Sequence, residues 1–400
     1  MLAQGNTSGG GVGGGVGGGV GGGVGGGVGG GVGGGVGGGV GGGVGAFDSL
    51  HAGSGASPLL SSALIATHDA VTPYWDGQPS ESPYQKPSIG DADYLYEVRD
   101  SMRALLLLLS MQQSFEITGD AATGKAQVSV GANPVFTMSR PHSTYFEQQL
   151  WWLRAYADLR GDRVPEIYQQ LGDILSFFGA QAMLDSGRRR ETLILLEATR
   201  SLAATIHTQV KFFCRAARPI DMAMQVQPII QTPDHSSFPS GHATEAFAVA
   251  TVLHRLATGQ DSGHGINTTA LPFRLAHRIA TNRTVAGVHF PVDNHAGAAL
   301  GCQIGEIVYC LAGGSSSARE VCFEVEESNS SAKESCDFLL RGFARHLTTV
   351  ASRNISQVEI VSAVFEKAQA EWPDRSKMSD GTDGDDSDAR PEQKSDGGED

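Results

Sequence analysis

A tract of almost pure glycine removes the start of this chain from any packed core. Residues 9–45 are glycine except for valine at every fourth position, from Val12 to Val44. Such a tract has almost no side chains to bury, and ordering its backbone costs a large conformational entropy. We therefore expect residues 1–46 to be a disordered, low-complexity leader.

The other end of the chain is also unsuited to a core. Residues 373–400 lack aromatic and branched apolar side chains, and they hold ten acidic residues against four basic ones. This segment supplies six of the fourteen net negative charges, so the rest of the chain is only mildly acidic. We expect residues 373–400 to be an acidic disordered tail and residues 47–372 to form the folded domain.

Composition excludes several classes of protein. A mildly acidic domain does not favour a nucleic-acid partner, which requires a basic face. No run reaches the eighteen uncharged apolar residues of a transmembrane segment, and the first residues show no signal peptide. We therefore expect a soluble protein that is cytoplasmic by default. The five cysteines (214, 302, 310, 322 and 336) are odd in number and lack metal-site spacing, which indicates buried free thiols in a reducing compartment.

The dominant hydrophobic period is helical. Apolar residues recur at near-helical spacing through residues 189–213, and the leucine run at 104–110 is expected to be buried. Only residues 126–130 and 321–325 look like strands, and both are short. The prediction is therefore an all-α fold, a helical bundle. Further helices are expected at residues 93–115, 144–159, 164–184, 242–256, 271–284 and 291–311.

The first segment with notable polar residues runs from Lys211 to Pro219. Lys211 and Arg218 are seven residues apart, which would place them on one helical face, and Pro219 is expected to end the helix. Two cations on one face repel each other, so they need an anion between them or separate partners. Taken alone, the segment also fits a basic helix end that complements the helix dipole.

The second segment is Phe238-Pro239-Ser240-Gly241-His242, immediately before an expected helix. Ser240 can cap that helix, Gly241 lets the backbone approach a ligand, and the free N–H groups of the first turn can bind an anion. His242 would lie at the mouth of that site and could transfer a proton near neutral pH. A simple capped turn explains the same residues.

The third segment extends from Asn282 to Asp293. Pro291 suits the first position of a helix, so His289 lies just before the helix and Asp293 about one turn inside it. The carboxylate of Asp293 can then bind one imidazole nitrogen, which fixes the tautomer and leaves the other nitrogen basic. Helix capping alone would also explain Asp293.

Together the three segments are far more specific than any one of them. They resemble the signature K-x6-R-P, then P-S-G-H, then S-R-x5-H-x3-D of the superfamily that joins type 2 phosphatidic acid phosphatases, bacterial acid phosphatases and vanadium haloperoxidases. Every signature position matches except one, where Asn282 replaces the usual serine. The signature spans residues 211–293, about a fifth of the chain.

The resemblance implies a catalytic domain with an oxyanion pocket inside a helical bundle. It implies that five residues bind the oxyanion: Lys211, Arg218, Ser240, Gly241 and Arg283. In a phosphatase His289 would attack phosphorus, Asp293 would orient it, and His242 would protonate the leaving oxygen. In a haloperoxidase His289 would bind the vanadium of vanadate, while halide and hydrogen peroxide would be the substrates.

The signature does not separate these two activities. Missing membrane helices, and the likeness of residues 228–243 to soluble haloperoxidase-like members, favour a vanadium-dependent haloperoxidase with vanadate as cofactor. His235 lies seven residues before His242, where bromide-using members carry histidine, so it is a candidate for tuning the halide preference. The alternative is a soluble phosphatase without a cofactor, which would hydrolyse a phosphomonoester or a lipid phosphate through a phosphohistidine at His289. A non-catalytic oxyanion-binding protein is a second alternative. A homo-oligomer is left open, and His207, His254, His277 and His295 are interpreted as ordinary histidines.

Overall fold

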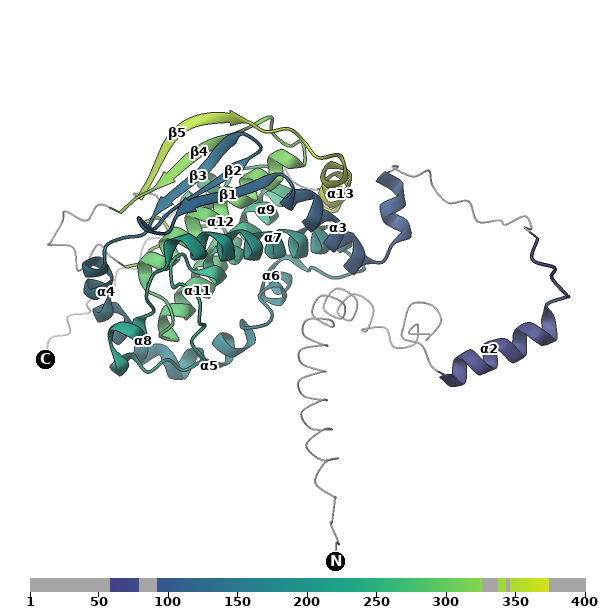
Figure 1. Ribbon diagram of the computed structural model, residues 1–400, viewed down its shortest axis with the longest axis horizontal. Coiled ribbons are helices and arrows are strands. Elements are labelled where there is room, and N and C mark those ends of the chain that lie inside the picture. Colours follow the sequence, from purple (N-terminus) through teal and green to yellow (C-terminus); the bar gives the residue numbers. More distant parts are fainter. Residues whose placement is uncertain (1–57, 79–91, 326–336, 343–345, 374–400) are drawn as a thin grey trace, which may run out of the picture.

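The computed structural model describes residues 58–78, 92–325, 337–342 and 346–373. It combines a bundle of helices with a five-stranded sheet, so the expected all-α fold is wrong (Figure 1). The expected leader and the expected tail beyond Pro373 lie outside the described residues, as does Cys336. Within the described ranges, no helix has the length and apolar character needed to cross a membrane.

The sheet joins two parts of the chain that lie far apart in the sequence. Its strands follow the order β1-β2-β3-β4-β5, and neighbours are antiparallel except for the parallel pair β3 and β4. That pair aligns Phe136 with Val321 and Met138 with Phe323. The strands are β1 (Phe115–Asp120), β2 (Lys125–Val130), β3 (Asn133–Ser139), β4 (Ser317–Phe323) and β5 (Leu347–Asn354).

Three of these strands were not predicted from the sequence, for physical reasons. β1 and β5 are the edge strands, and most of their residues are exposed or partly exposed, so apolar and polar residues do not alternate clearly. β3 carries Pro134 near its start, which weakens a strand prediction. β2 and β4 are the two strands that the sequence did indicate.

Four helices form the centre of the bundle. α9 (Gly241–Thr258) packs against three others, namely α7 (Arg190–Cys214), α11 (Leu271–Val285) and α12 (Pro291–Leu311). These bounds lie within a few residues of the predicted helices. α12 is buried along nearly its whole length, which explains its almost continuous run of small and apolar residues.

A stripe of glycines on α12 sets the distance between α9 and α12. A Cβ atom on Gly297 would lie 2.5 Å from the carbonyl oxygen of Ser240, and one on Gly301 would lie 2.3 Å from that of Thr244. Because the obstructing atoms belong to the backbone, no side-chain movement could make room for them. The glycines therefore fix the start of α9 against the start of α12, where the second and third sequence segments lie.

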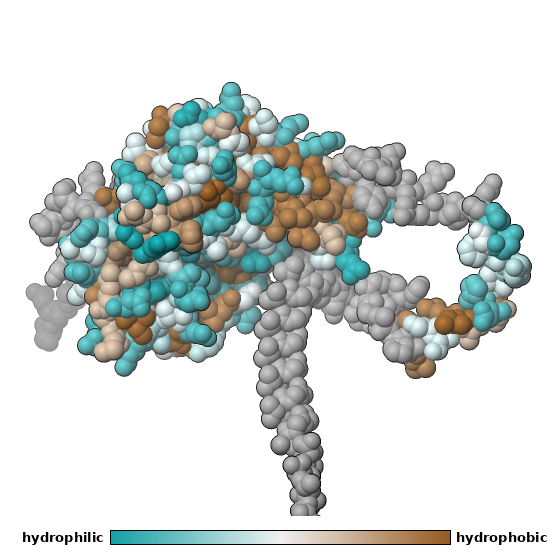
Figure 2. All heavy atoms as spheres, viewed as in Figure 1, coloured by the Kyte–Doolittle hydropathy of each residue, from teal (hydrophilic) through white to brown (hydrophobic). Residues whose placement is uncertain are grey.

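The sheet covers α7 and α12, and the remaining helices surround the bundle (Figure 1). α3 (Asp100–Gln112) holds the leucine run, which is only partly buried: Leu107 is fully buried, but Leu105 and Leu109 are exposed. Figure 2 shows a hydrophobic area over α3, the helix on which Leu105 and Leu109 are exposed. The expectation that the whole run is buried is therefore wrong, because α3 packs by one face only.

α13 (Glu359–Ala370) closes the fold by binding the start of α7. The carboxylate of Glu371, at the end of α13, accepts hydrogen bonds from the backbone N–H groups of Glu191 and Thr192, each at 2.9 Å. It thereby satisfies two N–H groups that the first turn of a helix leaves unpaired. Trp372 donates from Nε1 to the hydroxyl of Thr192 at 3.1 Å.

Cys214, Cys302 and Cys310 are buried free thiols as expected, whereas Cys322 is partly exposed.

The other helices are short or lie at the periphery. Between α9 and α11 the chain forms one more short helix, α10. These helices are α2 (Pro58–Val71), η2 (Ala92–Glu97), α4 (Ser143–Tyr156), η3 (Ala157–Leu159), α5 (Arg160–Gln169), α6 (Leu175–Ala182), α8 (Pro219–Met222), η4 (Met224–Val226) and α10 (Ser262–Asn267).

Candidate functional site

Lys211 lies in the last turn of α7 and is buried. Its ammonium group donates to the carbonyl oxygens of Ser236 at 2.8 Å and Ser237 at 3.2 Å. Among the residues that the structure describes, no carboxylate is paired with it directly, and burial, together with the nearby Arg218, lowers the pKa of Lys211 to about 7. An anion placed next to this ammonium group would restore its positive charge.

Arg218 reaches the same region from outside the helix. The expected placement of Lys211 and Arg218 on one helical face is wrong, because α7 ends at Cys214 and Arg215 takes a left-handed conformation with φ of 50°. Arg218 directly precedes α8, and its guanidinium donates to the carbonyl oxygens of His235 at 3.0 Å and Val288 at 2.8 Å. The turn after α7 thus brings the two cations to one loop, residues 235–237.

His289 and Asp293 form a buried pair. The Nδ1 atom of His289 lies 3.0 Å from the Oδ2 atom of Asp293, which also accepts from the backbone N–H of Phe290 at 2.9 Å and from the hydroxyl of Ser237. A carboxylate acceptor on Nδ1 holds the proton there, so Nε2 keeps its lone pair. The Nε2 atom lies 3.2 Å from an NH1 atom of Arg218.

Burial and charge perturb both members of this pair. Burial raises the pKa of Asp293 to about 6, although hydrogen bonds from Ser237 and Phe290 oppose the shift. Burial, followed by the positive charges of Arg218 and Lys211, lowers the pKa of His289 well below its ordinary value. The imidazole is therefore neutral at physiological pH, as a nucleophile or a ligand must be.

Ser240, Gly241 and His242 lie at the start of α9, next to this pair. The backbone N–H of Ser240 donates to the carbonyl oxygen of Asp293 at 2.8 Å, which joins the second segment to the third. Ser240 precedes the helix as expected, but its hydroxyl makes no capping hydrogen bond. That hydroxyl is buried and has no partner within the described part of the chain. Gly241 faces His207, because a Cβ atom there would lie 2.8 Å from the imidazole Cε1.

His242 is bound to the end of a different helix. Its Nε2 atom lies 3.0 Å from the carbonyl oxygen of Gln170, the residue that follows α5. A carbonyl oxygen can only accept, so Nε2 carries a proton and Nδ1 keeps the lone pair in the neutral ring. Burial, and then the charge of Arg283, lowers the pKa of His242 to about 3. A bound anion would oppose both effects and favour the protonated ring.

Arg283 lies on α11 and is almost fully buried. One NH2 atom donates to Gln170 Oε1 at 2.9 Å and to the carbonyl oxygen of Ile167 at 3.3 Å. Its Nε and NH1 atoms have no hydrogen-bond partner among the residues that the structure describes. Burial without a carboxylate partner lowers its pKa to about 10. An unpaired buried guanidinium is costly unless an anion binds to it.

Several residues of this region were missed or set aside in the sequence analysis. Asn282, which replaces the usual serine, donates to Gln170 Oε1 at 3.1 Å and to Glu166 Oε2 at 3.1 Å. It therefore positions α5 rather than pointing at the histidines. His207 lies 3.1 Å from Glu245 through Nε2 and packs against Gly241, so it borders the region. No sequence motif marks Gln170, since the partners of its side chain are more than a hundred positions away.

Three other histidines remain ordinary packing residues in the structure. His254 lies 3.3 Å from His264 through Nε2, and His277 binds the carbonyl oxygen of Phe338 at 2.8 Å. His295 is buried on α12 and meets the ring of Phe338 edge to face. His254 also meets the ring of Phe273 edge to face, and His295 lies against His346.

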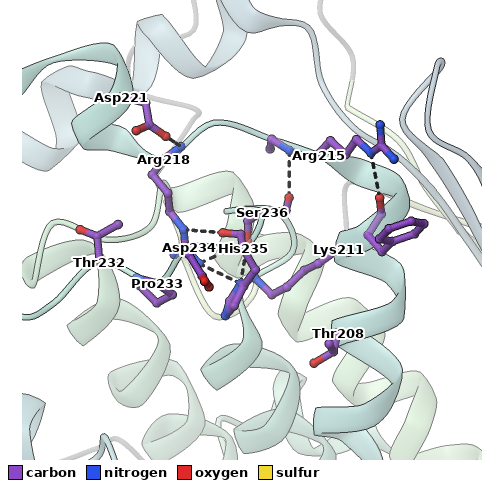
Figure 3. A pocket seen from close by; sticks show the side chains of 12 residues that line it. Thr208, Lys211, Arg215, Arg218, Asp221, Thr232, Pro233, Asp234, His235 and Ser236 are labelled. Carbon is purple, nitrogen blue, oxygen red and sulfur yellow. Dashed lines mark hydrogen bonds between the residues drawn. The ribbon is translucent and has the colours of Figure 1, made fainter.

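A cavity of about 550 Å³ adjoins the buried cluster. Lys211, Arg218 and His235 line it, whereas His242, Arg283 and His289 do not. Figure 3 shows the side chains of Arg218 and Lys211 converging on His235, whose Nδ1 lies 3.1 Å from an NH2 atom of Arg218. Two of the cations thus face both the cavity and the buried pair.

The arrangement can bind a tetrahedral anion. Lys211, Arg218 and Arg283 supply positive charge, and Ser240 and the first turn of α9 supply further donors. His289 offers a nucleophilic nitrogen, and His242 lies at the same end of the bundle. Vanadate and phosphate are both tetrahedral oxyanions, so this geometry alone does not distinguish them.

Comparisons with known proteins give the family. The model of the PAP2 superfamily matches residues 192–315. Two curated relatives, from Mycobacterium tuberculosis strains CDC 1551 / Oshkosh and ATCC 25618 / H37Rv, are each named decaprenylphosphoryl-5-phosphoribose phosphatase. Each is 36% identical over 147 residues, which cover 37% of this chain and 75% of the relative. The chain belongs to the PAP2 superfamily.

Membership has two consequences for the sequence-based predictions. The expected superfamily is confirmed, and the chain is an enzyme of the acid phosphatase type within it. Because the relatives are phosphatases, the comparisons favour the phosphatase alternative over the haloperoxidase that we expected from the sequence. They give no support to vanadate as a cofactor.

Proposed function

We propose that this chain is a phosphatase that hydrolyses phosphate monoesters through a phosphohistidine at His289. The observation that carries the proposal is the orientation of His289, whose Nδ1 binds the Asp293 carboxylate at 3.0 Å and whose Nε2 faces Arg218. This leaves a lone pair directed into a region of buried, uncompensated positive charge. The phosphatase relatives point to the same chemistry.

The first half of the reaction transfers the phosphoryl group to the enzyme. The Nε2 atom of His289 attacks phosphorus, the bond from phosphorus to the ester oxygen breaks, and the leaving oxygen takes a proton from His242. Lys211, Arg218 and Arg283 stabilise the charge on the transferred phosphoryl oxygens. Asp293 stabilises the positive charge that develops on the His289 ring.

The second half releases inorganic phosphate. Water gives a proton to His242 and attacks phosphorus, and the bond from phosphorus to His289 Nε2 breaks. His242 acts first as an acid and then as a base, so it returns to its starting state. The bound phosphate dianion raises the pKa of His242 from the low value of about 3 that burial causes in the empty pocket.

The neighbouring cavity is our candidate for the site of the alcohol part of the ester. Its wall carries Arg215, Asp221 and Asp234 as well as Thr232, groups that can form hydrogen bonds with hydroxyls. A hydroxylated alcohol suits this lining better than a long alkyl chain does. Since the relatives are named for a substrate with a 5-phosphoribose group, ribose 5-phosphate is the first substrate to test.

One side-by-side assay tests the proposal. We expect hydrolysis of p-nitrophenyl phosphate and of ribose 5-phosphate, inhibited by vanadate, and no bromination of a dione with vanadate, bromide and peroxide. His289→Ala should abolish hydrolysis, while His68→Ala, which changes an exposed histidine on α2, should not. Bromination without hydrolysis would establish the haloperoxidase instead, and binding of phosphate with neither activity would indicate a non-catalytic protein.

A further inference from the structure

Gln170 connects α5 to two residues of the candidate site. Its side-chain Oε1 atom accepts from Arg283 NH2 at 2.9 Å and from Asn282 Nδ2 at 3.1 Å. Its backbone carbonyl oxygen lies 3.0 Å from His242 Nε2. The residue is almost fully buried, so these contacts occur away from bulk water.

The orientation of the Gln170 amide follows from its neighbours. Arg283 can only donate, so the amide atom that faces it must be oxygen. The Nε2 atom then points the other way, and it is buried without a hydrogen-bond partner within the described ranges. Three other buried donors also lack a hydrogen-bond partner within the described ranges: Arg283 Nε, Arg283 NH1 and Ser240 Oγ.

The backbone of Gln170 fixes the proton position on His242. Gln170 follows the last turn of α5, where helix carbonyl groups have no partner within the helix. By accepting from Nε2–H, its carbonyl oxygen leaves Nδ1 as the nitrogen that can give or take a proton. Gln170 therefore orients Arg283 through its side chain and His242 through its backbone.

We propose that Gln170 is a positioning residue of the phosphatase site that aligns Arg283 through its side-chain oxygen and His242 through its backbone carbonyl. This inference rests on the proposed function. A neutral amide suits the role because it orients Arg283 without cancelling its charge. A carboxylate at the same position would neutralise Arg283 and replace the Nε2 donor with an acceptor.

The test compares Gln170→Glu with Gln169→Glu, which introduces the same charge one position earlier at an exposed site. We expect Gln170→Glu to weaken sulfate binding, measured by calorimetry, by at least about tenfold, because neutralising Arg283 costs at least as much as one hydrogen bond to a charged group. The basic limb of the pH profile of kcat, which reports the substrate complex, should also move to higher pH, because a nearby carboxylate favours protonated His242. Gln169→Glu should change neither quantity appreciably.

Two further results decide the inference. Gln170→Met, which keeps the length of the side chain and removes both polar atoms, should weaken sulfate binding without moving the pH profile. If Gln170→Glu binds sulfate as the unaltered chain does, or changes only the melting temperature, Gln170 is merely structural and the inference is wrong. If the unaltered chain neither binds sulfate nor hydrolyses p-nitrophenyl phosphate, the proposed function itself fails.

Discussion

At the scale of single residues, the site is defined by charge that the protein itself leaves unbalanced. Lys211 and Arg283 are buried cations that bind carbonyl and amide oxygens instead of carboxylates. The carboxylate of Asp293, which contacts the proposed nucleophile His289, also accepts hydrogen bonds from Ser237 and from the N–H of Phe290. Such an arrangement is unfavourable when empty and favourable with an anion bound, which is the property that a phosphoryl-transfer site needs.

Asp293→Asn tests the role of the histidine tautomer. An amide can donate to His289 Nδ1, which would move the ring proton to Nε2 and remove the attacking lone pair. We expect kcat for p-nitrophenyl phosphate to fall by about four orders of magnitude, comparable to tautomer reversal in a serine protease triad. Sulfate affinity should change far less, because the three cations remain. An unchanged kcat would show that Asp293 has only a capping role.

The pKa of Lys211 predicts how anion binding depends on pH. In the empty pocket burial and Arg218 lower this pKa to about 7, so the amine loses its charge as the pH rises above 7. A bound sulfate dianion raises the pKa, so binding at higher pH must be accompanied by proton uptake. We expect sulfate affinity to fall above about pH 7, by at most about tenfold per pH unit.

Calorimetry in buffers of different ionisation enthalpy would measure this proton uptake directly. Sulfate is the suitable anion because, unlike phosphate, it does not titrate in this range. Lys211→Met should bind sulfate more weakly and lose the slope above pH 7. An affinity that stays constant between about pH 6 and 9 in the unaltered chain would contradict the prediction.

At the scale of helices, backbone contact between α9 and α12 positions the signature segments. Gly297, Gly301 and Gly305 allow α12 to approach α9 so closely that any side chain would collide with it. The N-termini of both helices then meet, where Ser240 N–H binds the carbonyl oxygen of Asp293. The periodicity predicted both helices within a few residues, but the sequence analysis did not anticipate this closeness.

Gly301→Ala should therefore destabilise the protein and disturb the site. The new Cβ atom would lie 2.3 Å from the Thr244 carbonyl oxygen and 2.9 Å from Phe247 Cβ. Overpacking of this kind costs roughly 1–3 kcal/mol, so the melting temperature should fall and kcat with it. Gly161→Ala is the control, because no heavy atom lies within 4 Å of its Cβ position. Equal melting temperatures for the two variants would refute the close-packing argument.

At the scale of the whole molecule, the match to the family model covers only the bundle core and the residues near it. The PAP2 model matches residues 192–315, whereas all five strands lie outside that range, as does α13. β3 pairs with β4, and Glu371 binds the start of α7, the helix that carries Lys211. Segments on both sides of the family match therefore hold the bundle together.

We propose that residues 47–372 are the complete catalytic unit, with the bounds expected from composition. A chain limited to residues 47–372 retains Glu371 and buried Trp372, so its melting temperature and kcat should equal those of the full chain. Thermal unfolding and the p-nitrophenyl phosphate assay would measure both. A chain that stops at residue 357 is the comparison, because it lacks α13 and should unfold at a lower temperature. Loss of activity in the 47–372 chain would show that the end segments take part in the function.

The sequence by itself determined the parts of this protein that are encoded within a few helical turns. The spacing of His289 and Asp293, the Ser240–His242 segment before a helix and the helical periods of α9, α11 and α12 are all local, so they were predictable. The sheet was missed because β3 and β4 are joined only by tertiary pairing across most of the domain, and its edge strands are largely polar. The relation of Lys211 to Arg218 depends on where α7 stops, at a left-handed Arg215. Only the tertiary structure decided that Gln170 meets Arg283, because a hydrogen bond between residues 113 positions apart leaves no pattern in the local sequence.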